Sequence, residues 1–196
     1  MADKIATDFL TNIKAKSGEA IKWFRDIVMQ TRRKVLPAAT GRLQFTRERS
    51  IELTRTRPTW GKMYLFQYQA KWDEKLPYWD MWPLIFPFKY TSNGFYGINL
   101  HYLAPNDRAA LMIRLIRSQG KAGNMDENFK LFLSYKILTR FKPAIPCIKR
   151  YLYGQIQGKG LYGIGGNDWS YAAALPLQKF QKESAKYVWN QSAQMY

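Results

Sequence analysis

The sequence contains few of the residues that build disulfides and metal sites. It has one cysteine, Cys147, and one histidine, His101. A single cysteine excludes a disulfide within the chain, and together the two residues are too few for the usual zinc sites. We therefore expect no metal and no cofactor. Cys147, between Pro146 and Ile148, is expected to be a small buried apolar group.

Long hydrophobic runs are missing as well. No apolar stretch approaches the roughly 20 residues that a helix needs to cross a bilayer. The opening segment carries Asp3 and Asp8 and has no continuous apolar core, so it does not have the pattern of a secretory signal. We expect no membrane partner, and a location inside a cell or in a particle that is assembled there.

The sequence also lacks a convincing catalytic set. A serine or cysteine hydrolase needs a base beside its nucleophile, and His101 lies in the aromatic run NLHYL, where a hydrogen-bonded core residue is the commoner role. A metal-dependent nuclease needs clustered carboxylates. The candidates by exclusion are Asp80, Asp107, Asp126 and Glu127. Their spacing matches no nuclease motif, so we expect no enzyme.

Positive charge is what the chain has in excess. It carries 31 lysines and arginines against 14 acidic residues, a net charge of +17. Residues 1–60 contribute +7, residues 61–103 only +1, and residues 104–196 contribute +9. Such an excess attracts polyanions, which include nucleic acid, an anionic membrane surface or an acidic protein.

Residues 61–103 are expected to form the centre of the fold. Short apolar and aromatic runs begin at Met63, Leu84 and Phe95, and Pro or Gly residues separate them, which is typical of strands. Asn93 and Gly94 tolerate positive φ, so the corner at Ser92–Gly94 predicts a hairpin turn between the second and third runs. These features predict a small antiparallel sheet or a closed barrel.

Aromatic residues account for 16% of the chain and have two possible roles. Side chains of tyrosine and tryptophan among basic residues can stack on exposed bases. The commoner role, for Trp72, Tyr78 and Trp82, is to surround a small core or a subunit interface.

Upstream of the central segment, the sequence predicts a helical arm and a basic linker. Residues 1–30 show apolar side chains at helical spacing, with a break at Ser17-Gly18. Residues 31–60 are rich in arginine, which suits bidentate contact with phosphate or carboxylate. The candidate contact residues are Arg32, Arg33, Lys34, Arg42, Arg47, Arg49, Arg55 and Arg57. A solvated linker whose charge serves solubility explains this run equally well on its own.

Residues 61–196 are expected to form a single α+β core domain. Asn106 is the expected N-cap of a helix whose buried stripe includes Leu111 and Met112. Arg108 is expected to lie elsewhere on this helix.

The remaining part of the core is less regular in sequence. Residues 129–141 fit the helical and the strand period equally well. Residues 148–152 predict a short helix that contains two further candidate contact residues, Lys149 and Arg150. The glycine-rich residues 155–166 predict a twisted strand or a hairpin that returns to the sheet, and the C-terminal segment predicts another helix.

Several of these segments resemble a known family. The order GKMYLFQYQAK, KLPYWDMWPLIFPF and SNGFYGINLHYLAPNDRAAL, followed by FKPAIPCIKRYL, is similar to the DNA end protector family of T-even-type contractile-tailed bacteriophages. The resemblance covers residues 61–191. It implies a non-enzymatic virion protein that sits with the end of the packaged genome and shields it from host exonucleases.

The predicted fold is therefore α+β, a small antiparallel, SH3-like β-barrel or sheet decorated by helices, with an N-terminal helical arm. The expected function is to bind or shield the packaged DNA end at the head, neck or tail of a virion assembled in the host cytoplasm. The expected partners are the phosphate backbone of double-stranded DNA, other virion proteins, and further copies of the chain in a symmetric assembly. The alternative is a purely structural baseplate, neck or tail subunit whose basic charge faces acidic proteins.

Overall fold

The computed structural model describes residues 52–54, 57–59, 62–117, 141–165, 169–174 and 176–195. The predicted N-terminal arm and most of the basic linker lie outside these residues, as does the ambiguous segment 129–140. Within the part of the chain that the structure describes, no helix is long and apolar enough to cross a membrane.

Six strands form one antiparallel sheet in the order β1-β7-β2-β4-β5-β6. They are β1 (Glu52–Thr54), β2 (Met63–Tyr68), β4 (Leu84–Thr91), β5 (Gly94–Asn99), β6 (Ile148–Leu152) and β7 (Ile156–Ile164). The predicted strands at the three aromatic runs and at the glycine-rich segment are confirmed. The end of the basic linker also contributes, because β1 pairs with β7.

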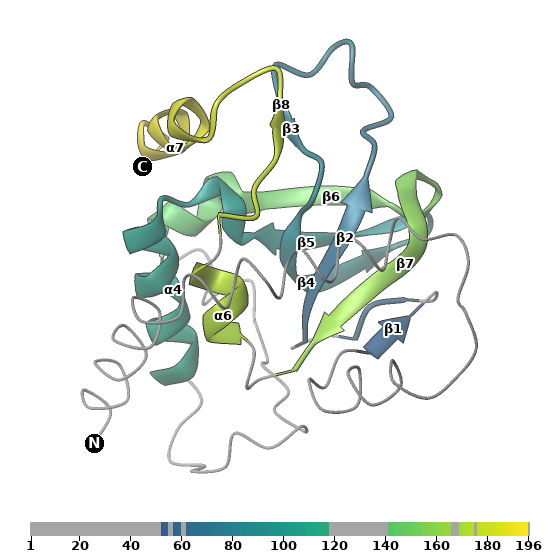
Figure 1. Ribbon diagram of the computed structural model, residues 1–196, viewed down its shortest axis with the longest axis horizontal. Coiled ribbons are helices and arrows are strands. Elements are labelled where there is room, and N and C mark those ends of the chain that lie inside the picture. Colours follow the sequence, from purple (N-terminus) through teal and green to yellow (C-terminus); the bar gives the residue numbers. More distant parts are fainter. Residues whose placement is uncertain are drawn as a thin grey trace.

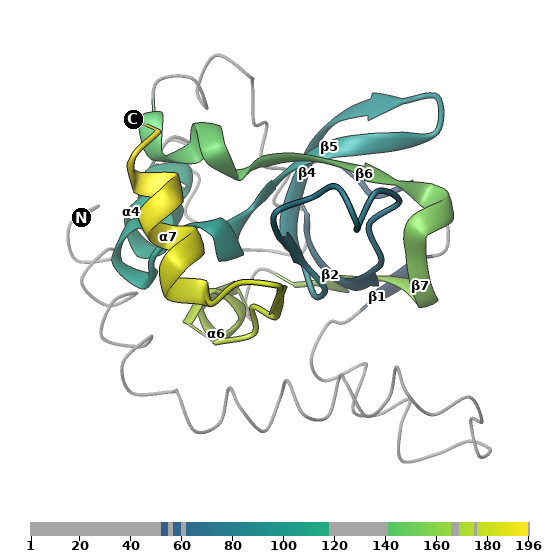
Figure 2. The same cartoon turned by 90° about the horizontal axis from the view of Figure 1, so that it is seen from above.

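The sheet curls into a half-barrel (Figure 2). β2 and β6 are separated by two strands in the sheet order, yet the rings of Phe66 and Tyr151 on these strands are only 5.3 Å apart. Register shifts in the β2–β7 and β4–β5 pairings, after Leu65 and Pro87, contribute to the bend. The concave face therefore holds its own aromatic core, which consists of Tyr64, Phe66, Tyr68, Ala70, Ile85, Phe95, Tyr151 and Leu161.

Helices cover the other face of the sheet at one end (Figure 1). They are η1 (Leu100–Tyr102), α4 (Pro105–Arg117), η2 (Lys142–Cys147), α6 (Trp169–Ala174) and α7 (Ala185–Ala193). A larger apolar core lies between them and the sheet, with Phe86 against Trp169 and with Leu111 and Met112 of α4 fully buried. Cys147 is buried here, as predicted. The α+β class with an antiparallel sheet is confirmed.

A short second sheet links the C-terminal segment to the loop after β2. It pairs β3 (Trp79–Asp80) with β8 (Phe180–Gln181). Figure 1 shows the β2–β3 loop rising from the edge of the half-barrel above this pair. A connecting turn, η3 (Tyr153–Gln155), joins β6 to β7. It also forms a hydrogen bond with the start of the β2–β3 loop, since the Gln69 amide donates to the Gln155 carbonyl at 3.1 Å.

The β4–β5 hairpin forms as predicted, but its turn works differently. Neither Asn93 nor Gly94 adopts positive φ. Glycine is required at position 94 because a Cβ there would lie 2.0 Å from the carbonyl oxygen of Tyr151 on β6. Close approach of two strands, and not turn geometry, explains this glycine.

Two local predictions were wrong. Ile148–Leu152 is a strand, because it completes the edge of the sheet beside β5 instead of forming a helix. Helix α4 begins at Pro105, so Asn106 lies inside the helix and not at its N-cap. Proline fits the first helical position because it lacks an amide hydrogen that would otherwise be unsatisfied.

Candidate nucleic-acid interface

Exposed charge on the described residues is predominantly positive. Nine lysine and arginine side chains are exposed, compared with two carboxylate side chains, those of Glu74 and Glu183. The nine are Arg57, Lys71, Lys75, Lys89, Lys142, Arg150, Lys179, Lys182 and Lys186. Within the described ranges, none of the nine forms an ion pair with a carboxylate.

Two of these cations lie on one face of the sheet beside the β4–β5 hairpin. Cross-strand pairing aligns Lys89 with Tyr96 and Tyr96 with Arg150. Paired residues point to the same face, so the three side chains form a row, and Lys89 Nζ is 5.9 Å from the centroid of the Tyr96 ring. Arg150 Nη2 donates to Asn93 Oδ1 in the hairpin turn at 2.9 Å, which orients the guanidinium.

Arg57 approaches the same hairpin from its other face, because Tyr90 pairs with Phe95 on the concave side of the sheet. Its guanidinium carbon is 5.9 Å from the centroid of Tyr90, the residue after Lys89 in β4. The Tyr90 hydroxyl donates to the carbonyl oxygen of Pro58, which ties this segment to the strand. Arg57, Lys89 and Arg150 are called the hairpin cluster below.

Lys149 and Arg150 are neighbours with different surroundings. Successive residues of a strand point to opposite faces, and only Arg150 is exposed. Lys149 is half-buried with its Nζ 4.1 Å from the centroid of Tyr102, and burial lowers its pKa. Arg150 is therefore the member of this pair that is presented to a partner.

The β2–β3 loop, residues 69–78, carries an exposed tryptophan between two lysines. Trp72 is 59% exposed. The ammonium groups of Lys71 and Lys75 lie 5.1 Å and 5.5 Å from the centroid of its ring. Trp82, by contrast, is buried in the core and Tyr78 packs against it, as expected for residues of this kind.

A lysine that directly follows β8 holds this loop in shape. Lys182 Nζ donates to the carbonyl oxygens of Asp73, Glu74 and Leu76 at 2.6, 3.2 and 2.9 Å, which engages all three of its hydrogens. Its backbone has a φ of 71°, a conformation that non-glycine residues seldom adopt. The Lys182 charge is thus directed into the loop and is not available to a ligand.

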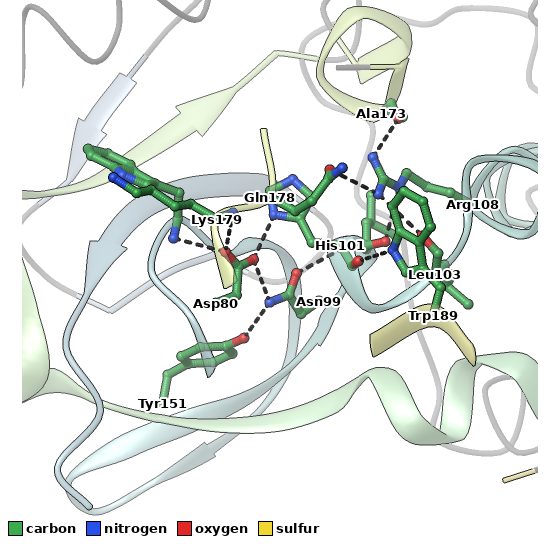
Figure 3. A network of polar contacts seen from close by, with 12 residues as sticks. Asp80, Asn99, His101, Leu103, Arg108, Tyr151, Ala173, Gln178, Lys179 and Trp189 are labelled. Atoms are coloured by element: carbon green, nitrogen blue, oxygen red, sulfur yellow. Dashed lines mark hydrogen bonds and ion pairs between the residues drawn. The ribbon is translucent and has the colours of Figure 1, made fainter. Parts of the chain in front are cut away.

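A buried polar network fixes β3 beneath the loop (Figure 3). Asp80 Oδ1 accepts hydrogen bonds from the amides of Trp82 at 3.0 Å and Lys179 at 3.2 Å. Its Oδ2 accepts from Asn99 Nδ2 at 3.1 Å and contacts His101 Nδ1 at 2.6 Å. One carboxylate therefore connects β3, the end of β5, η1 and the segment that leads into β8.

The pair of Asp80 and His101 is best described as a carboxylate and a neutral imidazole. Burial lowers the pKa of His101, the charge of Arg108 lowers it further, and these effects outweigh Asp80. Burial alone would raise the pKa of Asp80, but contacts with His101 and hydrogen bonds from Asn99 and the Trp82 amide keep it below its usual value. His101 Nε2 has no hydrogen-bond partner among the described residues, so a second ring proton would be unsatisfied. The predicted core role of His101 is confirmed.

Arg108 is buried, which corrects the expectation that it lies away from the buried stripe of α4. Its Nε donates to the carbonyl of Leu100 at 3.0 Å, Nη1 to Ala173 at 3.1 Å and Nη2 to Leu103 at 3.2 Å. Burial lowers its pKa to about 10, so it remains charged at neutral pH. Arg108 therefore joins α4 to η1 and α6 and contributes nothing to the exposed charge.

The structure locates only part of the predicted contact set. Arg57, Lys149 and Arg150 are described, and two of them belong to the hairpin cluster. Outside the described residues lie Arg32, Arg33, Lys34, Arg42, Arg47, Arg49 and Arg55. The sequence interpretation missed Lys89 and Trp72. Lys89 was detectable, because it is the only charged residue in the otherwise apolar and aromatic run LIFPFKYT.

Of the acids that were considered for a nuclease, the two that the structure describes, Asp80 and Asp107, do not form a metal site with other described residues. Asp80 is buried with both oxygens engaged in hydrogen bonds, Asp107 is in helix α4, and Asp126 and Glu127 fall outside the described residues. Across the described ranges, no group of three or more His, Cys, Asp or Glu side chains is placed to hold a metal ion.

Comparison with known proteins agrees with the resemblance in the aromatic and C-terminal segments. The family model described as the phage T4 terminal DNA protecting protein matches residues 3–195. No curated protein and no solved structure matches the chain. The family match extends through the arm and linker as well as the half-barrel. This chain therefore belongs to the phage T4 terminal DNA protecting protein family.

Proposed function

We propose that this chain is a non-enzymatic virion protein that binds the end of packaged linear DNA and shields it from nucleases. The role in DNA protection comes from the description of the family to which the chain belongs. The hairpin cluster is the observation that carries the proposal for this chain: three cations lie at one hairpin, Lys89 and Arg150 on one face and Arg57 on the other, and none is paired with a carboxylate of the described residues.

The cluster suits the phosphate backbone better than it suits base edges. Arg57 and Arg150 supply guanidinium forks, which match phosphate oxygens in a bidentate geometry. The hairpin itself is built from strands β4 and β5 and not from a helix, which is the element that commonly enters a major groove to read bases. Contact with phosphates is independent of sequence, as protection of a DNA end requires.

Several finer features belong to the same proposal. The sheet order β7-β2-β4-β5-β6, with a 3-10 turn between β6 and β7, supports an SH3-like barrel. The arginines of residues 31–55 would extend the phosphate contacts, and residues 1–30 would contact other virion proteins or further copies of the chain. Residues 61–196 would then form the core domain. Assembly into the particle would take place in the host cytoplasm, with the protein at the head, neck or tail.

The proposal is tested by measuring duplex binding across a salt series. A triple variant, Arg57→Gln, Lys89→Gln and Arg150→Gln, removes the hairpin cluster. If each cation neutralises one phosphate, the slope of log K against log salt becomes shallower by about 2 to 3.

The matched control removes the same charge elsewhere, through Lys142→Gln, Lys179→Gln and Lys186→Gln. We expect the control to leave the slope close to that of the parent chain. Equal effects of the two triples would contradict a localised interface. Absence of duplex binding by the parent chain at moderate salt would favour a structural subunit whose cations face acidic proteins.

A further inference from the structure

We propose that Trp72 at the tip of the β2–β3 loop stacks on the terminal base pair of a DNA end. This inference rests on the proposed function and adds the element that distinguishes an end from the interior of a duplex. Phosphate contacts are the same along a duplex, whereas an exposed flat base pair occurs only at its ends. A protein that recognises ends therefore needs an apolar surface that matches that face.

Trp72 has the properties that such a contact requires. It is 59% exposed, although buried tryptophans of the same chain, Trp82 and Trp169, are each 5% exposed. The neighbouring Leu76 is 37% exposed and its amide donates to the Trp72 carbonyl at 3.1 Å, so the two apolar side chains sit on one tight turn. An indole ring provides the flat aromatic surface on which bases stack.

The loop is held in place before any ligand binds. The Lys182 ammonium engages three loop carbonyls. At the base of the loop, Gln69 Nε2 donates to Asp73 Oδ2 at 2.8 Å, which also occupies that carboxylate. A preformed loop loses less conformational freedom on binding. The exposure of Trp72 is therefore a property of an ordered turn.

The flanking lysines point to a ligand that combines an aromatic face with negative charge. Lys71 and Lys75 place their ammonium groups beside the Trp72 ring. Cation–π contacts at exposed sites contribute roughly 2- to 5-fold in an equilibrium constant, whereas stacking of a base on an aromatic side chain contributes roughly 5- to 150-fold. The gain from stacking therefore exceeds the gain from the cation–π contact, so a base pair is able to displace a lysine from one face of the ring.

A protein partner fits this tip less well. Interface cores are enriched in aromatic residues but depleted of lysine, and here two lysines contact the tryptophan itself. The turn also exposes one carboxylate, that of Glu74. The formal charges of Lys71 and Lys75 are balanced by those of Asp73 and Glu74. The loop therefore adds little electrostatic attraction of its own, and stacking supplies its contribution.

The test uses the full chain and two duplexes of equal length, one with a single blunt end and one closed at both ends by loops. 2-Aminopurine in the terminal base pair reports stacking through its fluorescence. The parent chain is expected to prefer the blunt duplex, by a ratio that hardly changes with salt, because stacking releases few counterions. Trp72→Ala should lose roughly 5- to 150-fold in affinity for the blunt duplex and keep its affinity for the closed one. Trp72→Phe should retain most of the preference.

A control variant, Ile145→Ala, removes another exposed apolar side chain, which lies in η2. It should change neither affinity. If Trp72→Ala keeps the end preference and the fluorescence change, the stacking proposal is overturned while the proposed function stands. An equal loss of affinity for both duplexes also overturns it. If the parent chain shows no preference for ends, both proposals fail.

Discussion

His101 offers a test of the buried network, because it is the only histidine in the chain. Burial lowers its pKa, so the folded protein keeps the imidazole neutral while the unfolded chain takes up a proton near pH 6.5. The unfolded state then binds more protons than the folded state as pH falls, which lowers the free energy of unfolding. With a neutral folded imidazole, the loss between pH 7 and pH 5.5 is about 1.3 kcal/mol.

Thermal unfolding followed by circular dichroism between pH 5.5 and pH 7 measures this effect. For a chain of this size the loss corresponds to a fall in Tm of roughly 3 to 5 °C. The variant His101→Gln has no titrating group at this position and should lose the pH dependence, whatever its absolute stability. Asp80, whose pKa is also lowered, adds a further loss only at lower pH, where the unfolded chain protonates this carboxyl group while the folded protein still keeps it ionised.

A protein that becomes more stable on acidification would refute the assignment of His101 as a neutral imidazole. If His101 were an imidazolium paired with Asp80, its folded pKa would be raised, and acidification from pH 7 would leave the protein equally stable or more stable. The ¹⁵N chemical shifts of the ring provide a second readout. A neutral ring with its proton on Nδ1 is expected, since this atom faces the carboxylate at 2.6 Å.

Three further substitutions test the packing. Gly94→Ala should destabilise the chain by about 1–3 kcal/mol, because its Cβ would meet the Tyr151 carbonyl. The control Gly154→Ala, where a Cβ meets nothing within 4 Å, should leave the midpoint of urea unfolding unchanged. Equal midpoints for the two variants would contradict the argument. Arg108→Leu leaves three carbonyls without their donor and should cost at least about 2 kcal/mol; urea unfolding at the parent midpoint would refute this. Lys182→Met should speed hydrogen exchange in the β2–β3 loop with little change in Tm, and unchanged exchange would show that the loop does not depend on Lys182.

The sheet was predictable because its strands carry strong local patterns. The runs that begin at Met63, Leu84 and Phe95 are apolar on both faces, and the structure buries both faces, one in the concave aromatic core and the other under the helices. His101 and Cys147 were also predictable as core groups, since both are surrounded by apolar residues in the sequence.

Features that depend on distant contacts were not predictable. Arg108 lies away from the apolar stripe that the helical spacing predicts to be buried. Its burial depends on three carbonyl partners that lie outside α4. The segment that contains Lys149 has a helical pattern, yet pairing with β5 makes it a strand. Likewise, the sequence does not distinguish the exposed Trp72 from the buried Trp82, because Lys182, far along the chain, sets the shape of the loop.

Protection of a DNA end from an exonuclease is the most direct test of the account. Linear blunt duplex is incubated with the full chain and then with a processive double-strand exonuclease, beside a sample without the chain and one with the hairpin-cluster triple variant. The account predicts that the parent chain preserves full-length DNA and that the triple variant preserves much less at the same concentration. Degradation at equal rates with and without the parent chain, under conditions in which it binds the duplex, would contradict the central claim.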